Sequence, residues 1–196
     1  MLHHRAFGRH RDTLTVAVID NRRPILSLMR AMLAAIGAGR IETYESPTEA
    51  LDAMTRDPPD LVIAAANMQP VNGTSLVKSM RRASSGPLSL VPAMIMSVHA
   101  TPALVEEALK AGAHQVLVLP TTASTLYRRL DWLINDDRSF ELRGDRYVVA
   151  GMEERLSLSF QRPVYVPPGP EVPPPALSTD DPASLGGAKK ARAAPH

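Results

Sequence analysis

Cysteine is absent from the 196-residue sequence. This absence excludes a disulfide framework and any metal site built from thiolates. Long apolar runs are absent as well, because no stretch approaches the roughly 20 consecutive apolar residues that a membrane-spanning helix needs. The opening residues 1–5 also lack the apolar run of a secretory signal. We therefore expect a cytoplasmic protein with no membrane partner.

The chain carries little net charge. The 22 Lys and Arg residues exceed the 20 Asp and Glu residues by two, which is too small an excess to indicate nucleic-acid binding by itself. Part of the excess lies near the ends, at Arg5, Arg9, Arg11, Lys189, Lys190 and Arg192. Solvated tails explain these charges at least as well as a phosphate-binding surface. No helix-turn-helix pattern follows residue 135, so we expect no nucleic-acid partner.

Short apolar runs alternate with helical patterns from residue 14 to about residue 135. Three runs are almost continuously apolar, which is typical of parallel strands covered on both faces, at residues 14–19, 61–65 and 93–97. Two further strands are predicted at residues 40–44 and 116–119. Helical periodicity predicts helices at residues 22–36, 46–57, 76–82, 102–111 and 122–134. This alternation favours an α/β fold with a doubly wound, five-stranded parallel sheet.

Three other regions flank the predicted domain at residues 14–137. Residues 1–13 are polar and basic, and we expect them to form a flexible arm. Residues 138–161 form an extension, in which alternating residues on both sides of Gly144 and Asp145 predict a hairpin. Residues 162–196 are rich in proline and then in small residues and lysine. They cannot bury enough apolar surface to offset their ordering, so a disordered tail is expected.

Ligand sites of open parallel sheets lie beyond the carboxyl ends of the strands. The residues at these ends are Asp20 and Asn21, residues 65–67, residues 97–99, and Leu119 with Pro120. They offer one carboxylate, amides, a hydroxyl and an imidazole. Since Mg²⁺ normally requires one or two carboxylates, we expect magnesium binding to be weak or absent, with no other cofactor.

Over residues 14–135, the order of elements resembles the CheY-like (flavodoxin-like) receiver domain of response regulators. Three stretches carry the resemblance: residues 18–21, residues 61–73 and residues 111–120. It implies a (βα)5 fold, here with a C-terminal extension. In that family, the first stretch ends in two acids that hold Mg²⁺, and the second contains an aspartate that accepts phosphate from a histidine kinase. The third stretch ends in a lysine, followed by proline, that binds the phosphoryl group.

The resemblance also implies that the phosphorylation pocket is degenerate. Asp20 retains the first acid, while Asn21 replaces the second. Ala65 stands at the position of the phosphate-accepting aspartate, and Leu119 replaces the lysine. The remaining positions are the retained hydroxyl of Ser97, the loop residue Asn67, and Val116 in place of the aromatic residue that rotates when the family switches. Pro120 is retained, and the bond before it is a candidate cis peptide.

No other side chain is expected to replace the missing aspartate. The amide of Asn67 is a poor nucleophile. Asp60 precedes the third strand, so at roughly 3.3 Å per residue it lies about 15 Å away, at the opposite end of the sheet. Without the lysine and the second acid, little would stabilise the charge that develops in phosphoryl transfer.

We therefore predict a non-enzymatic pseudo-receiver that acts by protein–protein contact. The family presents the face formed by its fourth helix, fifth strand and fifth helix to partners. Here that face would include Leu104, Glu107, Leu126, Tyr127 and Leu130. The expected partner is a histidine kinase, another signalling protein, or a second copy in a homodimer.

Two alternatives remain open at this stage. The first is a scaffold that acts through its proline-rich tail and the basic residues 189–192. The second is a sensor that binds a small molecule in a pocket lined by Asn21, Asn67, Ser97 and His99. A deletion of the tail distinguishes the first alternative, and a thermal-shift screen with metabolites and nucleotides distinguishes the second.

Overall fold

A computed structural model describes residues 2–151 of the chain. Its central sheet contains five parallel strands: β1 (Thr15–Ile19), β2 (Arg40–Tyr44), β3 (Leu61–Ala65), β4 (Ala93–Ser97) and β5 (Gln115–Val118). Their order across the sheet is β2-β1-β3-β4-β5. This confirms the doubly wound α/β fold that the alternation predicts. The expectations for the proline-rich tail and for residues 152–161 of the extension lie outside the described residues.

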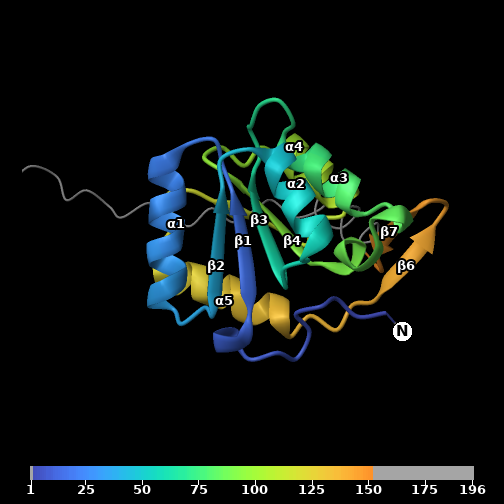
Figure 1. Ribbon diagram of the computed structural model, residues 1–196, viewed down its shortest axis with the longest axis horizontal. Coiled ribbons are helices and arrows are strands. Elements are labelled where there is room, and N and C mark those ends of the chain that lie inside the picture. The colour runs from blue at the N-terminus through green and yellow to red at the C-terminus, as the bar shows by residue number, and fades with distance from the viewer. Residues whose placement is uncertain (1, 152–196) are drawn as a thin grey trace, which may run out of the picture. The chain divides into compact units, whose positions relative to one another are not determined.

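Five α-helices cover the two faces of the sheet: α1 (Arg23–Ala35), α2 (Pro47–Arg56), α3 (Gly73–Met80), α4 (Pro102–Lys110) and α5 (Ala123–Ile134). Helices α1 and α5 lie on one side, and α2, α3 and α4 on the other (Figure 1). Ser46 caps α2 by accepting a hydrogen bond from the backbone N–H of Glu49 (3.3 Å), as the sequence predicts. Helix α3 begins three residues earlier than predicted, because Asn72 caps it by accepting from the N–H of Ser75 (2.8 Å).

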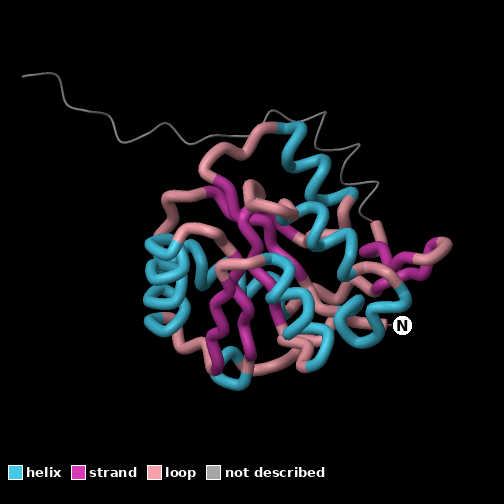
Figure 2. Tube along the Cα trace, turned by 45° about the horizontal axis from the view of Figure 1, so that its top comes forward, coloured by secondary structure: helices cyan, strands magenta, loops and turns pink. Residues whose placement is uncertain are grey.

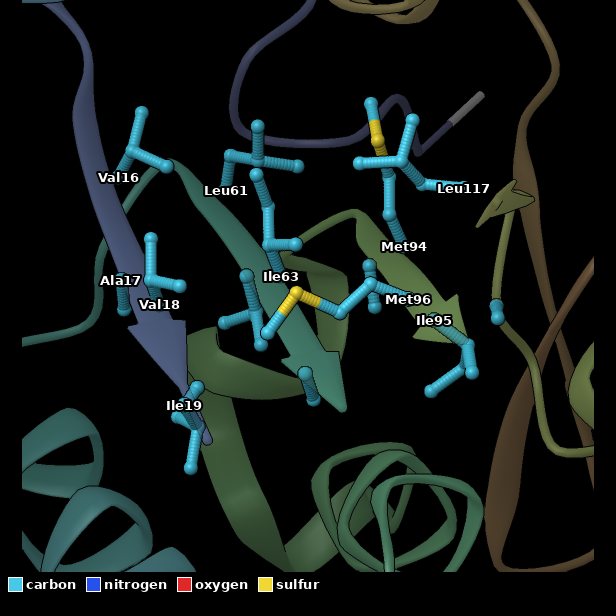
Figure 3. Packing of buried hydrophobic residues seen from close by; sticks show 14 of the residues in the cluster. Val16, Ala17, Val18, Ile19, Leu61, Ile63, Met94, Ile95, Met96 and Leu117 are labelled. Carbon is cyan, nitrogen blue, oxygen red and sulfur yellow. The ribbon is translucent and has the colours of Figure 1, made fainter. Parts of the chain in front are cut away.

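The core lies between the three central strands and the helices. All five residues of β3 and of β4 are buried, and so are the last four of β1. Figure 3 shows the apolar side chains of these strands within the core. The outer strands differ, since β2 is only partly covered and β5 ends in the exposed Val118. Complete burial of the central strands explains why their sequences are continuously apolar rather than alternating.

The connection between α3 and β4 contains a 3-10 helix, η2 (Ala83–Leu90), that the sequence does not predict. It is interrupted at Gly86, whose φ of 56° lies in the left-handed region. Serine, glycine and proline in this stretch are typical of a loop, so neither helical periodicity nor an apolar stripe reveals it.

A hairpin, formed by β6 (Phe140–Arg143) and β7 (Arg146–Val149), follows α5. The turn at Gly144, with a φ of 64°, matches the alternation around it in the sequence. The hairpin docks on the domain through backbone hydrogen bonds from Tyr147 N to Arg81 O and from Ala83 N to Asp145 O, both 2.8 Å. It lies beside the first residues of the chain (Figures 1 and 2).

The N-terminal segment, residues 2–13, is packed rather than loose, which corrects the expectation of a flexible arm. It ends in a short 3-10 helix, η1 (Arg11–Thr13). Ala6 is fully buried, and Gly8 N donates to Ile134 O at the end of α5 (2.8 Å). Arg9 forms an ion pair with Asp60 at the amino end of β3. Contacts with residues more than 40 positions away hold this segment, and no local pattern in the sequence reports them.

Arg81 is buried beneath the hairpin. Its guanidinium donates to the carbonyls of Gly112 (3.0 Å), Ser89 (2.9 Å) and Val91 (2.8 Å), and it lies 4.8 Å from the centre of the Phe140 ring. Burial lowers the pKa of Arg81 to about 9. Across residues 2–151, no helix is both long and apolar enough to cross a membrane.

Candidate functional site

The predicted pocket residues meet at the carboxyl edge of the sheet. Strand register places Ile19 beside Ala64, Ala65 beside Met96, and Ser97 beside Val118. The strand ends are therefore level, and the loops that follow them converge. Asp20, Ala65, Ser97 and Leu119 lie at this edge, whereas Val116 is half-buried within β5 opposite Ile95.

Asp20 directly follows β1 at this edge, and its carboxylate is bonded to a neighbouring residue. The backbone N–H and Nε of Arg22 donate to Oδ1 of Asp20 (2.8 and 3.0 Å), and Nη2 donates to Oδ2 (2.8 Å). The hydrogen bond to Asp20 raises the pKa of Arg22. Sequence reasoning missed Arg22, although an arginine two residues after a strand-end aspartate is a signal that could have revealed it.

Asn21 holds three loops together. Its Nδ2 donates to the carbonyls of Glu45 (2.6 Å) and Gln69 (3.3 Å), and its Oδ1 accepts from the N–H of Gln69 (2.8 Å). These bonds join the loop after β1 to the loops after β2 and β3. Asn21 is therefore engaged as a structural clamp between these loops.

Ala65 ends β3 with a buried methyl group that has no hydrogen-bonding atom. The loop after it folds back tightly, because a Cβ atom on Gly73 would overlap the carbonyl oxygen of Ala65. Gly73 N donates to Ala66 O (3.3 Å). Asn67 lies on this loop with its side chain exposed. Close backbone approach is thus the reason for glycine at position 73.

The other strand ends present little free polarity. Oγ of Ser97 donates to the carbonyl of His99 (2.9 Å) and accepts from its N–H (3.2 Å), so the hydroxyl is used within its own loop. Leu119 is buried and precedes a cis peptide bond to Pro120. A second cis bond joins Gln69 to Pro70.

The donor set does not fit a magnesium site. Mg²⁺ requires one or two carboxylates with free oxygens, but Asp20 is engaged by Arg22 and Ala65 has none. Among the described residues, no cluster of three or more His, Asp or Glu side chains could hold a metal ion. Two surface hollows are lined by other residues: one of about 670 Å³ by Trp132 and Arg138, and one of about 320 Å³ by Arg23 and Thr43.

The predicted interaction face is partly wrong. Leu126 and Leu130 are buried in the core, because their four-residue spacing places them on the side of α5 that faces the sheet. Leu104 is half-buried, whereas Glu107 and Tyr127 are exposed. The exposed apolar residues of this region that the sequence did not reveal are Val98, Val118 and Trp132.

Glu107 and Tyr127 contact neighbouring elements. Oε1 of Glu107 accepts a hydrogen bond from Oγ1 of Thr74 on α3 (2.6 Å). The guanidinium of Arg11, from the N-terminal segment, lies 4.1 Å from the centre of the Tyr127 ring. The N-terminal segment therefore reaches the exposed face of α5.

Comparison with known proteins places this geometry in a family. The model of the response regulator receiver domain matches residues 16–131. Chemotaxis protein CheY-3 of Vibrio cholerae is 24% identical over 118 residues, which cover 60% of this chain and 89% of CheY-3. The sensory/regulatory protein RpfC of Xanthomonas campestris is 26% identical over 123 residues; the match covers 61% of this chain but only 17% of RpfC.

Solved structures show the same fold. CheY4 of Vibrio cholerae superposes with a TM-score of 0.56 at 25% identity, over 61% of this chain and 98% of CheY4. The receiver domain of sensor histidine kinase PA1611 from Pseudomonas aeruginosa, which has a magnesium ion coordinated in its active-site cleft, superposes with a TM-score of 0.57 at 19% identity, over 63% and 98% of the two chains. The family model covers more than half of the sequence and the fold agrees with it, so the chain belongs to the response regulator receiver domain family.

Proposed function

We propose that this chain is a pseudo-receiver of two-component signalling, which acts by protein–protein contact without aspartyl phosphorylation. The observation that carries the proposal is the methyl group of Ala65 at the carboxyl end of β3, where the family has its phosphate-accepting aspartate. A methyl group has no lone pair with which to attack phosphorus. Residue 65 is also buried, so it presents neither a reactive group nor an exposed surface at this point.

Within residues 2–151, no neighbouring group is equipped to replace the aspartate. Asp20 is paired with Arg22, and the hydroxyl of Ser97 is bonded to His99. Asp60 lies at the amino end of β3, where it pairs with Arg9 and accepts from the N–H of Thr15 (2.9 Å). It is therefore at the wrong end of the sheet for phosphoryl transfer.

The charge that develops during phosphoryl transfer would also be unsupported. Phosphoryl transfer depends almost entirely on positioning and on electrostatic stabilisation of the transferring group. Leu119 contributes a buried hydrocarbon side chain where the family has lysine. We therefore propose that the chain is not an enzyme and requires no Mg²⁺ or other cofactor.

A protein partner is supported by the exposed apolar residues near β5 and α5. Val98, Val118, Tyr127 and Trp132 are all exposed, and they lie in the loop after β4, in β5 and in α5. The partner is a signalling protein of the two-component class, such as a histidine kinase, or a second copy of this chain.

The phosphorylation part of the proposal is tested by incubating the full chain with acetyl phosphate and Mg²⁺, followed by intact-mass measurement. A receiver with an intact aspartate is the positive control. We expect no added phosphate on the wild-type chain. Stoichiometric acid-labile phosphate on it would refute the proposal.

The interaction part is tested by affinity capture from the source cells with matched variants. The double variant Tyr127→Ala/Trp132→Ala is compared with Leu28→Ala, which removes a similarly exposed apolar side chain from α1. We expect the double variant to lose the partner and Leu28→Ala to retain it. A chain ending at residue 151, which keeps the docked hairpin, is expected to bind as the full chain does. Loss of binding with that truncation would favour the tail as the binding element instead.

A further inference from the structure

Asp20 and Arg22 form an ion pair of unequal burial. The side chain of Asp20 is 0% exposed, whereas that of Arg22 is 49% exposed. The carboxylate is therefore withdrawn from water at the end of β1, and the guanidinium connects it to the surface. Such a carboxylate requires a compensating cation, because an unpaired buried charge costs several kcal/mol.

The geometry of the pair leaves little of the carboxylate for another cation. An ionised carboxylate has about four lone-pair positions. Three donors of Arg22 occupy both oxygens: two on Oδ1 and one on Oδ2. A bidentate arginine fork is a strong and geometrically specific partner of a carboxylate. About one lone-pair position, on Oδ2, is left, so a divalent cation that binds both oxygens would have to displace these bonds.

The adjacent residue cannot supply replacement ligands without breaking other contacts. Oδ1 of Asn21 accepts from the N–H of Gln69, and its Nδ2 donates to two carbonyls. Turning this side chain toward a cation would release the loops after β2 and β3. Position 65 provides a methyl group. The edge of the sheet is thus arranged around the arginine.

We propose that the guanidinium of Arg22 is a built-in replacement for the divalent cation at this site: it balances Asp20 and makes the domain insensitive to Mg²⁺. The inference rests on the proposed function, since a site that never transfers phosphate has no use for an exchangeable metal. It assigns Arg22 as the residue that determines cation specificity at the edge. A metal ion that binds and dissociates lets a site respond to the metal concentration. The guanidinium of Arg22 is part of the chain, so it holds the loop after β1 in one state.

The experiment uses the full chain with Arg22→Gln, Asp20→Asn, the double variant, and Arg23→Gln as a matched control. Arg23 is 81% exposed and pairs with Glu45 on the surface, so its loss leaves Asp20 paired. Mn²⁺ is titrated in, and paramagnetic broadening of the amide signals of residues 20–22 and 66–67 is recorded. Thermal midpoints are measured with and without Mg²⁺ at constant ionic strength.

The wild-type chain and Arg23→Gln are expected to show no local broadening and no shift of the midpoint with Mg²⁺. Arg22→Gln should lower the midpoint by roughly 4–8 °C, because Asp20 is left without its partner. It should also gain broadening around residue 20 and recover part of the midpoint with Mg²⁺. Combining it with Asp20→Asn should abolish the broadening and reverse most of the loss, because no unpaired carboxylate remains.

Two results would overturn the inference. One is local Mn²⁺ broadening in the wild-type chain, and the other is an Arg22→Gln variant with an unchanged midpoint and no broadening. If Arg22→Gln does not fold, Arg22→Lys is measured in its place. This variant keeps the positive charge but loses the planar guanidinium, so its Mn²⁺ broadening should be weaker than that expected for Arg22→Gln. The absence of any broadening in Arg22→Lys would count against the inference. Phosphate on the wild-type chain would refute the proposed function through a separate measurement.

Discussion

Replacing Phe140 with alanine tests whether the C-terminal hairpin is an integral part of the domain. Phe140 begins β6 and is buried. Its ring lies 4.8 Å from the guanidinium carbon of Arg81 and 5.5 Å from the ring of His114. Leu90, Leu109 and Tyr147 pack around the pair formed by Phe140 and Val149. The ring therefore joins the hairpin to α4, to η2 and to the buried cation.

The loss of unfolding free energy in Phe140→Ala can be worked out from the buried area of the ring and its contact with Arg81. A buried phenylalanine removes about 200 Å² from water, which at about 25 cal/mol per Å² gives ~5 kcal/mol as a ceiling. Phe→Ala replacements in protein cores cost about 3–5 kcal/mol. A desolvated cation–π contact with Arg81 contributes up to about 2 kcal/mol of this stabilisation. We expect Phe140→Ala to lower the free energy of unfolding by about 4 kcal/mol.

Urea denaturation of the two variants Phe140→Ala and Leu142→Ala measures this loss. Leu142 lies on the same strand but is 55% exposed, so its replacement should change stability by less than about 0.5 kcal/mol. If Phe140→Ala costs no more than Leu142→Ala, the hairpin does not pack on the domain in solution. The account of Arg81 as a cation covered by this ring would then be wrong.

Three further predictions concern the site and the buried histidines. Gly73→Ala should destabilise the domain by about 2–3 kcal/mol, because its Cβ would overlap the Ala65 carbonyl; an unchanged urea midpoint would contradict the tight turn. Ala65→Asp alone should remain unphosphorylated by acetyl phosphate in an intact-mass assay, because Leu119 still stands where the family has its phosphoryl-binding lysine. Phosphorylation of this variant would show that the missing aspartate is the only defect. Burial lowers the pKa of His4 and lowers that of His114 further, so both bind a proton less readily in the folded chain than in the unfolded one. In the unfolded chain both histidines gain protons below about pH 6.5. Their contribution to the free energy of unfolding should therefore be full above that pH and fall below it, by up to about 1.4 kcal/mol per pH unit for each histidine. Thermal midpoints that stay constant down to pH 5 would contradict this.

The strands and most helix boundaries could be predicted because their signals are local. The run at residues 61–65 is continuously apolar and proves to be buried on both faces. Ser46 identifies the start of α2 from four consecutive residues. By contrast, α3 begins at Gly73 with Asn72 as its N-cap. Because glycine is a poor helix former, the sequence does not indicate that the helix begins there.

Contacts between distant residues could not be predicted. The burial of His4 and Ala6 depends on α5 and on the hairpin. Nε2 of His4 donates a hydrogen bond to the carbonyl of Asp136, 132 residues away (3.1 Å). Nothing in a polar, basic stretch indicates such a partner. Hydrophobic composition alone therefore underestimates how much of the chain belongs to the domain.

The candidate site was predicted in position but not in its internal bonding. Strand ends located Asp20, Ala65 and Ser97 correctly at one edge. That Arg22 covers the retained acid is a three-dimensional fact, although the spacing of Asp20 and Arg22 was available. The prediction for Leu126 and Leu130 is wrong because the resemblance indicates which helix forms the partner surface but not which side of that helix is exposed.

The central claim, that this receiver does not use a phosphoryl switch, is tested most directly by recording amide NMR spectra of the full chain before and after addition of acetyl phosphate and Mg²⁺. The account predicts unchanged signals for Ser97, for Val116 and for the residues of α5. Changes that begin at the end of β3 and extend through Val116 to α5 would contradict it.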